Sequence, residues 1–238
     1  MMDISLVIPA YNEEKYIGAC LDSALKNTHG RFKEIIVVDN ASTDNTARIA
    51  GERPGVTVIR EDRRGTGHAR QTGLEHATGD IVVYIDADTH VPEGWVEKIE
   101  RAFVDPEVVL LSGPYRYYDI VWYKRWLLNS LWWISAPVTS AAVGFMALGG
   151  NMAMKRTVLQ SVGFDRSIAF FGDDTDIARR MHEVGKTLWR MSFYINTSAR
   201  RFQQMGIVRT NVLYVANYLW PVIFHRPFSN GHHDIEHT

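Results

Sequence analysis

The sequence predicts an α/β fold with a single, mostly parallel sheet that is covered by helices on both faces. Two features of the 238-residue chain predict it. Short apolar segments rich in valine and isoleucine alternate with segments of helical periodicity through the first half. The apolar segments are nearly continuous, which is typical of strands buried on both faces. Strands separated by helices pair in parallel, because each helix carries the chain back to the starting edge of the sheet.

Five apolar segments are predicted to be strands of this sheet, at residues 4–11, 34–40, 56–62, 80–88 and 108–113. Helices are predicted between them, at residues 12–27, 42–52, 67–77 and 92–103. In the first helix, Ile17, Leu21 and Leu25 recur at helical spacing. The second helix opens with capping residues. Pro92 suits the first turn of the last helix, because its φ angle is already helical.

The second half of the chain is less regular. Residues 149–156 are predicted to be a strand that leads into a helix, and residues 186–198 a further strand. Residues 172–185 are predicted to be a helix, because acids stand at its N-terminus and Gly185 at its end. Residues 114–148 are rich in aromatic side chains and show no clear period, so no element is assigned to them.

Composition excludes several classes of protein. A net charge of −1 argues against a nucleic-acid partner. The only cysteine, Cys20, cannot form an internal disulfide and favours a reducing compartment. The N-terminal residues do not form a signal peptide, so a cytoplasmic location is expected. The uncharged stretch between Arg125 and Lys155 is long enough to cross a bilayer, but polar residues and glycines interrupt it, so a buried or interfacial segment is expected.

Acidic residues stand where predicted strands end. Asp39, Asp86 and Asp88 and the turn at residues 9–13 all follow such strands, and ligands of open α/β sheets bind beyond these carboxyl ends. These residues are therefore expected to line one cleft. A dinucleotide enzyme is not expected, because the first turn, PAYNEE, lacks the GxGxxG pattern, and GTGHARQTG has the wrong spacing.

The Asp86-x-Asp88 pair has two interpretations. Alternate strand residues share a face, so two carboxylates there repel each other unless a cation compensates them. Mg²⁺ prefers oxygen ligands and commonly shares them with phosphates. Equally, the two acids precede the helix predicted from Pro92 and can cap it. The pattern alone leaves both interpretations open.

Five motifs occur in order along the chain: SLVIPAYNEEKYIGACLDSAL, EIIVVDNASTDNTARIA, GTGHARQTGLEHATGDIVVYIDADTHVP, GGNMAMKRTVLQSVGFD and FFGDDTDIARRMHEVGK. Each is weak alone, but together, over residues 3–200, they closely resemble glycosyltransferase family 2, the inverting nucleotide-sugar transferases with the GT-A fold. The resemblance implies a Rossmann-like, mostly parallel sheet with an irregular acceptor-side half. One domain is then expected, divided into a nucleotide-binding half (1–113), an acceptor and catalytic half (114–206), an apolar C-terminal helix (207–228) and a disordered tail (229–238).

The resemblance implies a nucleotide-sugar site in the first half. Tyr11 would lie against the base, with Pro9 and Glu13 beside the base and ribose. Asp39 would accept the N–H of uracil, which implies a UDP-sugar donor. The residues alone suggest that Asp39 and Ser42 form a turn and a helix cap, and the two roles are compatible.

The resemblance also implies a cation site. Asp88 would ligate Mg²⁺ or Mn²⁺ directly, and Asp86 would contact ribose or water bound to the metal. Arg70 matches a position that faces the nucleotide, although Gln71 stands where an asparagine is usual. An exposed cation is the alternative interpretation of Arg70.

Asp174 matches the catalytic base of the family, and Asp173 replaces the usual glutamate before it. Acids that stabilise a helix start are the alternative. Gly149, Gly150 and Asn151 would lie against the donor sugar, because small residues allow close backbone approach.

The acceptor is expected to be a glycan or a lipid-linked molecule. Aromatic residues cluster before and inside the uncharged stretch, and such side chains stack on sugars and favour membrane interfaces, among them Tyr115, Trp122, Trp126, Trp132 and Trp133. Peripheral membrane contact is the leading interpretation, and a helical core or a dimer interface is the alternative. Arg200-Arg201 would reach a diphosphate or a lipid phosphate, or lie in a solvated turn, and His225 is a weak candidate metal ligand.

Two other functions remain open. A polyprenyl phosphate acceptor is already ionised and needs no base, so Asp174 argues against it. The second is a protein that binds nucleotide sugars without catalysis, and the presence of both acidic motifs, Asp86-x-Asp88 and Asp173-Asp174, argues against it.

Overall fold

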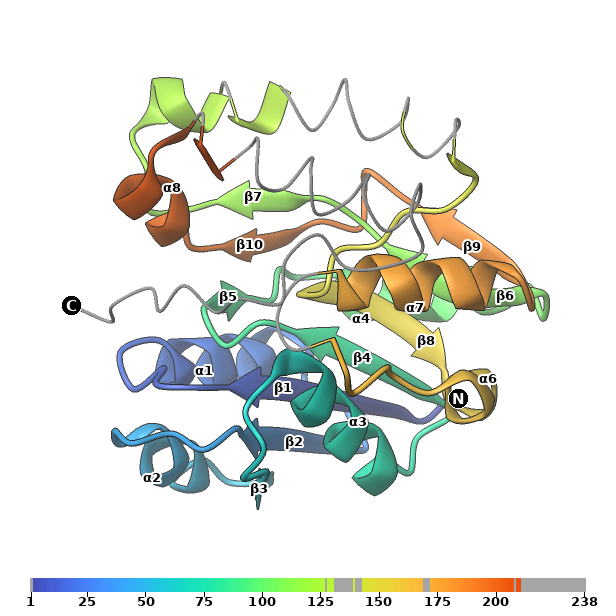
Figure 1. Ribbon diagram of the computed structural model, residues 1–238, viewed down its shortest axis with the longest axis horizontal. Coiled ribbons are helices and arrows are strands. Elements are labelled where there is room, and N and C mark those ends of the chain that lie inside the picture. Colours follow the sequence, from blue (N-terminus) through green and yellow to red (C-terminus); the bar gives the residue numbers. More distant parts are fainter. Residues whose placement is uncertain are drawn as a thin grey trace.

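A seven-stranded sheet with helices on both faces forms the centre of the described part of the chain (Figure 1). The computed structural model describes residues 2–126, 128–130, 139, 143–168, 172–207 and 209–210. The strand order is β3-β2-β1-β4-β8-β6-β9. The strands are β1 (Ile4–Ala10), β2 (Glu34–Asp39), β3 (Val56–Arg60), β4 (Ile81–Ile85), β6 (Val108–Ser112), β8 (Asn151–Lys155) and β9 (Lys186–Trp189).

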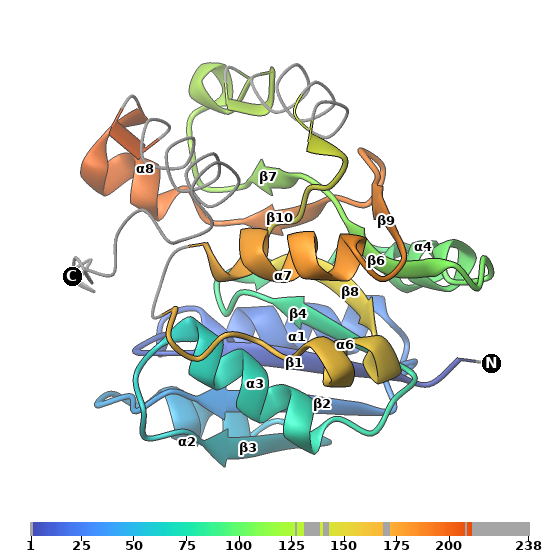
Figure 2. The same ribbon diagram turned by 45° about the vertical axis from the view of Figure 1, so that its right-hand side comes forward.

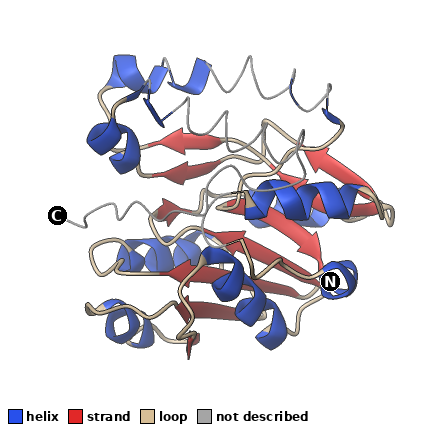
Figure 3. Ribbon diagram, in the orientation of Figure 1, coloured by secondary structure: helices blue, strands red, loops and turns tan. Residues whose placement is uncertain are grey.

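The sheet is mostly parallel, as the sequence predicts. Strand β8 pairs antiparallel with β4 and β6, and the other neighbouring strands of this sheet pair in parallel. Figure 3 shows the alternation of helices and strands that produces this arrangement. The register between Ala10 of β1 and Asp39 of β2 places the ends of these two strands side by side.

Helices cover both faces of the sheet (Figure 2). On one face lie α1 (Ile17–Asn27), α2 (Thr46–Gly51) and α4 (Trp95–Ala102), and on the other lie α3 (Thr66–His76), α6 (Arg156–Val162) and α7 (Asp173–His182).

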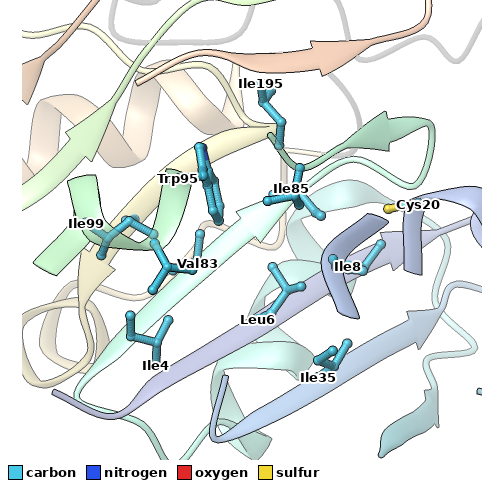
Figure 4. Close-up of a cluster of buried hydrophobic side chains, with 14 of the residues drawn as sticks. Ile4, Leu6, Ile8, Cys20, Ile35, Val83, Ile85, Trp95, Ile99 and Ile195 are labelled. Carbon is cyan, nitrogen blue, oxygen red and sulfur yellow. The ribbon is translucent and has the colours of Figure 1, made fainter. Parts of the chain in front are cut away.

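The two apolar clusters follow the alternation of side chains along the strands. Leu6 and Ile8 of β1 pack with α1 on one face (Figure 4), whereas Val7 packs with α3 on the other. Successive side chains of a strand point to opposite faces, so a continuous apolar strand supplies both clusters. This double burial explains the nearly continuous apolar sequence of the central strands β1 and β4.

A second, three-stranded sheet was not predicted. Its order is β5 (Thr89–His90), β10 (Ile195–Thr197) and β7 (Tyr115–Tyr117), and α8 (Arg200–Met205) follows β10. Trp95 connects the two sheets, because its ring stacks on Phe193 at 5.0 Å between centroids and lies near Ile195 (Figure 4).

The prediction of one continuous strand at residues 186–198 is wrong. This segment forms β9 in the large sheet and β10 in the small one, separated by a turn that the Phe193 N–H closes on the Arg190 carbonyl at 3.0 Å. Apolar residues on both sides of the turn concealed it. The first helix begins at Ile17 rather than residue 12, because the Glu13 carbonyl accepts the N–H groups of Tyr16 and Ile17 in a turn.

Several expectations lie outside the described residues. They concern most of the helix at 207–228, the tail at 229–238, Trp132, Trp133 and His225. Within the described ranges, every helix is too short or too polar to cross a bilayer.

Candidate active site

The Asp86-x-Asp88 pair lies in a turn directly after β4. The Thr89 N–H donates to the Asp86 carbonyl at 3.2 Å, so the chain turns here instead of continuing the strand to residue 88 as predicted. The Asp86 side chain is 43% exposed, whereas Asp88 is buried. The two carboxylates therefore lie in different surroundings. Because residues 86–89 form a turn, the alternation of side chains along a strand does not place both carboxylates on one face.

Asp86 is approached by the backbone of the Gly149-Gly150 turn. The Tyr115 hydroxyl donates to Asp86 Oδ2 at 3.3 Å and accepts the Gly150 N–H at 2.9 Å. A Cβ atom at Gly150 would collide with the Asp86 carboxylate, and one at Gly149 would collide with the Arg70 guanidinium. A side chain at either position would therefore displace one of these charged groups, which glycine avoids.

Arg70 is buried and ion-paired, so the interpretation as an exposed cation is wrong. Its guanidinium on α3 bonds the carboxylate of Asp173, which is buried at the start of α7. Its Nη2 atom also lies 3.9 Å from Asp86 Oδ1. Arg70 thereby connects the acids after β4 with the acids of α7.

Asp174 is the second residue of α7 and is partly buried. Its Oδ2 accepts the Gly149 N–H at 3.1 Å, and its Oδ1 accepts the Thr175 N–H at 2.8 Å. Burial, and next the charge of Asp173, raise the pKa of Asp174 to about 6. A carboxyl group that titrates near neutrality suits a proton acceptor. Gly149 and Arg70 thereby link Asp174 to Asp86.

Asp88 belongs to a second ionic group, with Glu13 and Arg200. Arg200 Nε lies 3.0 Å from Asp88 Oδ2, and its two terminal nitrogens bond the two carboxylate oxygens of Glu13. Burial raises the pKa of Asp88 to about 7, although Arg200 acts to lower it. Burial likewise raises the pKa of Glu13 above its ordinary value, against the opposing hydrogen bond from Arg200.

The predicted base-binding residues lie at the ends of β1 and β2. Asp39 is buried, and its carboxylate accepts the Ser42 N–H at 3.2 Å and an Arg60 N–H at 3.0 Å. The turn suggested by the residues is therefore present, but the predicted helix cap at Ser42 is wrong, because α2 begins at Thr46 after Asn45 and the Ser42 hydroxyl accepts the Asn12 N–H at 3.0 Å. The Arg64 guanidinium covers the partly exposed ring of Tyr11 at 4.1 Å, and Pro9 is also partly exposed.

Asn151, which was expected to lie against the donor sugar, is buried between the two sheets. Its side chain is fully buried, donates to the carbonyls of Gly113 and Phe193, and accepts the Trp95 indole N–H at 3.3 Å. With these partners the amide ties β8 to both sheets, and it offers no exposed atom to a donor sugar.

Three residues of the site were missed by the sequence analysis or given no position in it. Tyr115 was noted only as one aromatic residue among many. Thr197 donates its hydroxyl to Asp88 Oδ1 at 3.4 Å, and Asp119 accepts the Ala199 N–H at 2.6 Å beside Arg200. The small sheet brings these residues to the site, and a sequence pattern does not report pairing between such distant segments.

The acids after β4 fit a divalent cation that is shared with a ligand. Within the described ranges, no three His, Cys, Asp or Glu side chains form a metal cluster. Asp86 and Asp88 are carboxylates, the ligands that Mg²⁺ and Mn²⁺ prefer, and Asp86 keeps an exposed carboxylate. Mg²⁺ is usually held by one or two carboxylates together with substrate phosphates.

The fold and the acidic site define a glycosyltransferase of the GT-A class. The mannosyltransferase PcManGT from Pyrobaculum calidifontis, solved in complex with GDP-Man and Mn²⁺, superposes with a TM-score of 0.69 and 25% identity over 94% of this chain and 66% of that one. Glucosyl-3-phosphoglycerate synthase from Mycobacterium tuberculosis, solved with Mn²⁺, UDP and phosphoglyceric acid, superposes with a TM-score of 0.65 and 24% identity, over 93% of this chain and 78% of that one.

Residues 5–163 match the family model of glycosyl transferase family 2, and the chain belongs to that family. Glycosyltransferase GlyG of Streptococcus pneumoniae is 32% identical over 121 residues, which is 49% of this chain and 40% of GlyG. Poly(ribitol-phosphate) beta-N-acetylglucosaminyltransferase TarS of Staphylococcus aureus is 32% identical over 111 residues, 44% of this chain and 19% of TarS. The chain thus spans less than half the length of these two relatives.

Proposed function

We propose that this domain is a metal-dependent inverting glycosyltransferase that moves a hexosyl or N-acetylhexosaminyl group from a UDP-sugar to a hydroxyl group. The position of Asp174 carries the proposal, because this carboxyl group of raised pKa bonds the Gly149-Gly150 turn, which in turn contacts Asp86. The neighbours solved with Mn²⁺ and a nucleotide or nucleotide sugar support it.

In the proposed reaction, Asp174 accepts the proton of the acceptor hydroxyl while that oxygen forms a bond to the anomeric carbon. The bond from the anomeric carbon to the diphosphate oxygen breaks on the opposite side, so the configuration inverts and the nucleoside diphosphate leaves. A divalent cation held by Asp86 and Asp88, when bound, offsets the negative charge of this leaving group. Arg70 orients Asp173 and keeps positive charge beside Asp86 and Asp174.

The decisive experiment changes Asp174 to Asn. Turnover of UDP-sugars is expected to fall by about 10²–10⁴-fold, the usual contribution of a general base, while UDP binding with Mn²⁺ persists. Asp176→Asn is the matched control, because Asp176 lies on the same helix but pairs with Arg179 and Arg180. Full activity in Asp174→Asn would instead favour an acceptor that is already ionised, such as a polyprenyl phosphate. UDP binding without turnover in the unchanged protein would favour a non-catalytic nucleotide-sugar-binding protein.

The nucleotide preference is tested in the same assay. Asp39 is proposed to accept the ring N–H of uracil, and guanine presents a ring N–H as well. UDP is expected to compete for the site more strongly than CDP or ADP, whose bases lack that donor. A GDP arm distinguishes the proposed UDP donor from the donor class seen with PcManGT.

We also propose a lipid-linked acceptor reached by peripheral membrane contact at the cytoplasmic face. Trp122 is 76% exposed and Trp126 69% exposed, and Lys124 and Arg125 lie between them in sequence. Exposed tryptophans beside basic residues favour anionic bilayer interfaces. Co-sedimentation with anionic vesicles is expected, and the double change Trp122→Ser with Trp126→Ser should reduce it. An acceptor that is a soluble glycan predicts no binding to vesicles.

A further inference from the structure

Arg200 lies beside Asp88, where its positive charge opposes the binding of a metal cation to that carboxylate. Its Nε lies 3.0 Å from Asp88 Oδ2, and Nη1 lies 2.8 Å from Glu13 Oε2. The Arg200 side chain is 22% exposed, and each carboxylate that it bonds is 11% exposed. One guanidinium therefore compensates two largely buried acids.

This arginine is held in place by its own surroundings. Asp119 accepts the Ser198 hydroxyl at 2.5 Å and the Ala199 N–H at 2.6 Å, directly before Arg200. The Gln203 amide donates to the Asp119 carbonyl at 2.7 Å, and the Tyr16 ring lies 4.8 Å from the guanidinium carbon. These contacts orient the start of α8, so Arg200 is a built part of the site rather than a mobile surface residue.

The two acids after β4 consequently differ in what they offer a metal ion. Both carboxylate oxygens of Asp88 have partners, Thr197 at 3.4 Å and Arg200 at 3.0 Å. Asp86 keeps an exposed carboxylate. A divalent cation that approached Asp88 in the free domain would meet a charge of like sign already bonded to its ligand. One exposed carboxylate alone holds Mg²⁺ or Mn²⁺ weakly, since such ions retain most of their waters.

We propose that Arg200 closes Asp88 to divalent cations in the free domain, so that the cation binds together with the nucleoside diphosphate rather than before it. The inference rests on the cation site of the proposed function. A diphosphate supplies the oxygen ligands that the free site lacks, and its negative charge offers Arg200 a second anionic partner. Binding of the nucleotide and binding of the cation are then coupled, and each increases the affinity for the other by the same factor.

The test is a titration of the full chain with MnCl₂, followed by the electron paramagnetic resonance signal of free Mn²⁺, with and without UDP, from which the Mn²⁺ that UDP binds in the absence of protein is subtracted. Arg200→Gln is expected to tighten Mn²⁺ binding without UDP by about tenfold or more, because Asp88 and Glu13 lose their compensating charge. The factor by which UDP tightens Mn²⁺ binding should become smaller in this variant. Arg200→Lys retains a positive charge and is expected to bind Mn²⁺ without UDP more weakly than Arg200→Gln does.

Arg31→Gln is the matched control. Arg31 also bridges two acids, Glu97 and Glu100, and its side chain is 27% exposed, but it precedes β2 at the opposite end of that strand from Asp39. Its removal should leave Mn²⁺ binding unchanged. Unchanged or weaker Mn²⁺ binding by folded Arg200→Gln without UDP, while UDP still promotes Mn²⁺ binding in the unchanged protein, overturns this inference alone. Failure of UDP to promote Mn²⁺ binding in any form of the protein overturns both the inference and the proposed cation site.

Discussion

Loss of Arg70 is expected to destabilise the fold more than loss of any exposed arginine. The side chains of Arg70 and Asp173 are 6% and 5% exposed, so Arg70→Met would leave a buried carboxylate without its cation. Breaking a buried pair in this way costs about 3–5 kcal/mol, which exceeds the contribution of an exposed pair by several-fold. For a domain of this size that loss corresponds to a fall in melting temperature of about 6–20 °C.

A double-mutant cycle distinguishes this cause from a simple loss of packing. Asp173→Asn removes the charge that Arg70→Met would leave unpaired, so the double variant should be more stable than the sum of the single effects predicts, by about 1–3 kcal/mol. Urea denaturation gives the free energies of unfolding. Arg166→Met is the control, because Arg166 pairs with Glu75 while both are over a third exposed and contributes about 0–1 kcal/mol. Additive single effects within about 0.5 kcal/mol would refute the reasoning.

Three further predictions concern the site and its support. The rate of transfer should rise with pH through about 6, because Asp174 accepts a proton only when it is ionised, and a pH–rate profile measures this. Gly150→Ala should weaken Mn²⁺-dependent UDP binding in calorimetry without unfolding the domain, because the added Cβ displaces the Asp86 carboxylate. Hydrogen bonds, first from Arg63, lower the pKa of Glu61 to about 2, below its unfolded value of 4.5. The stability that Glu61 contributes is therefore complete above pH 4.5 and lost as the pH falls towards 2, and acid denaturation of Glu61→Gln should lack this component.

Most of the large sheet could be predicted, because its buried strands β1, β2, β4 and β6 each carry an apolar pattern of their own. Residues such as Val37 and Val83 are buried by helices on the face that they meet, so burial leaves a local apolar pattern. The small sheet leaves none. Its strands are two or three residues long and pair segments near residues 89, 115 and 195. Because these segments are far apart in the sequence, no single segment shows a pattern that predicts their pairing. The same limit explains why one strand was predicted over residues 186–198.

The acids of the site could be named from motifs, but their partners could not. Asp86 and Asp174 stand in recognisable patterns, whereas Tyr115 stands in an aromatic run with many equivalent candidates. A motif also does not report what a side chain bonds, as Asn151 shows: contact of this segment with the donor sugar stays a prediction. The buried Asn151 amide bonds Gly113 and Phe193, because an amide can satisfy two backbone carbonyls at once.

Asp86 and Asp88 belong to two separate ionic groups, and each group contains an arginine. Asp86 joins Arg70 and the Gly149-Gly150 turn of the large sheet, whereas Asp88 joins Arg200 beside the small sheet. An anion bound between these groups would interact with arginines from both parts of the chain.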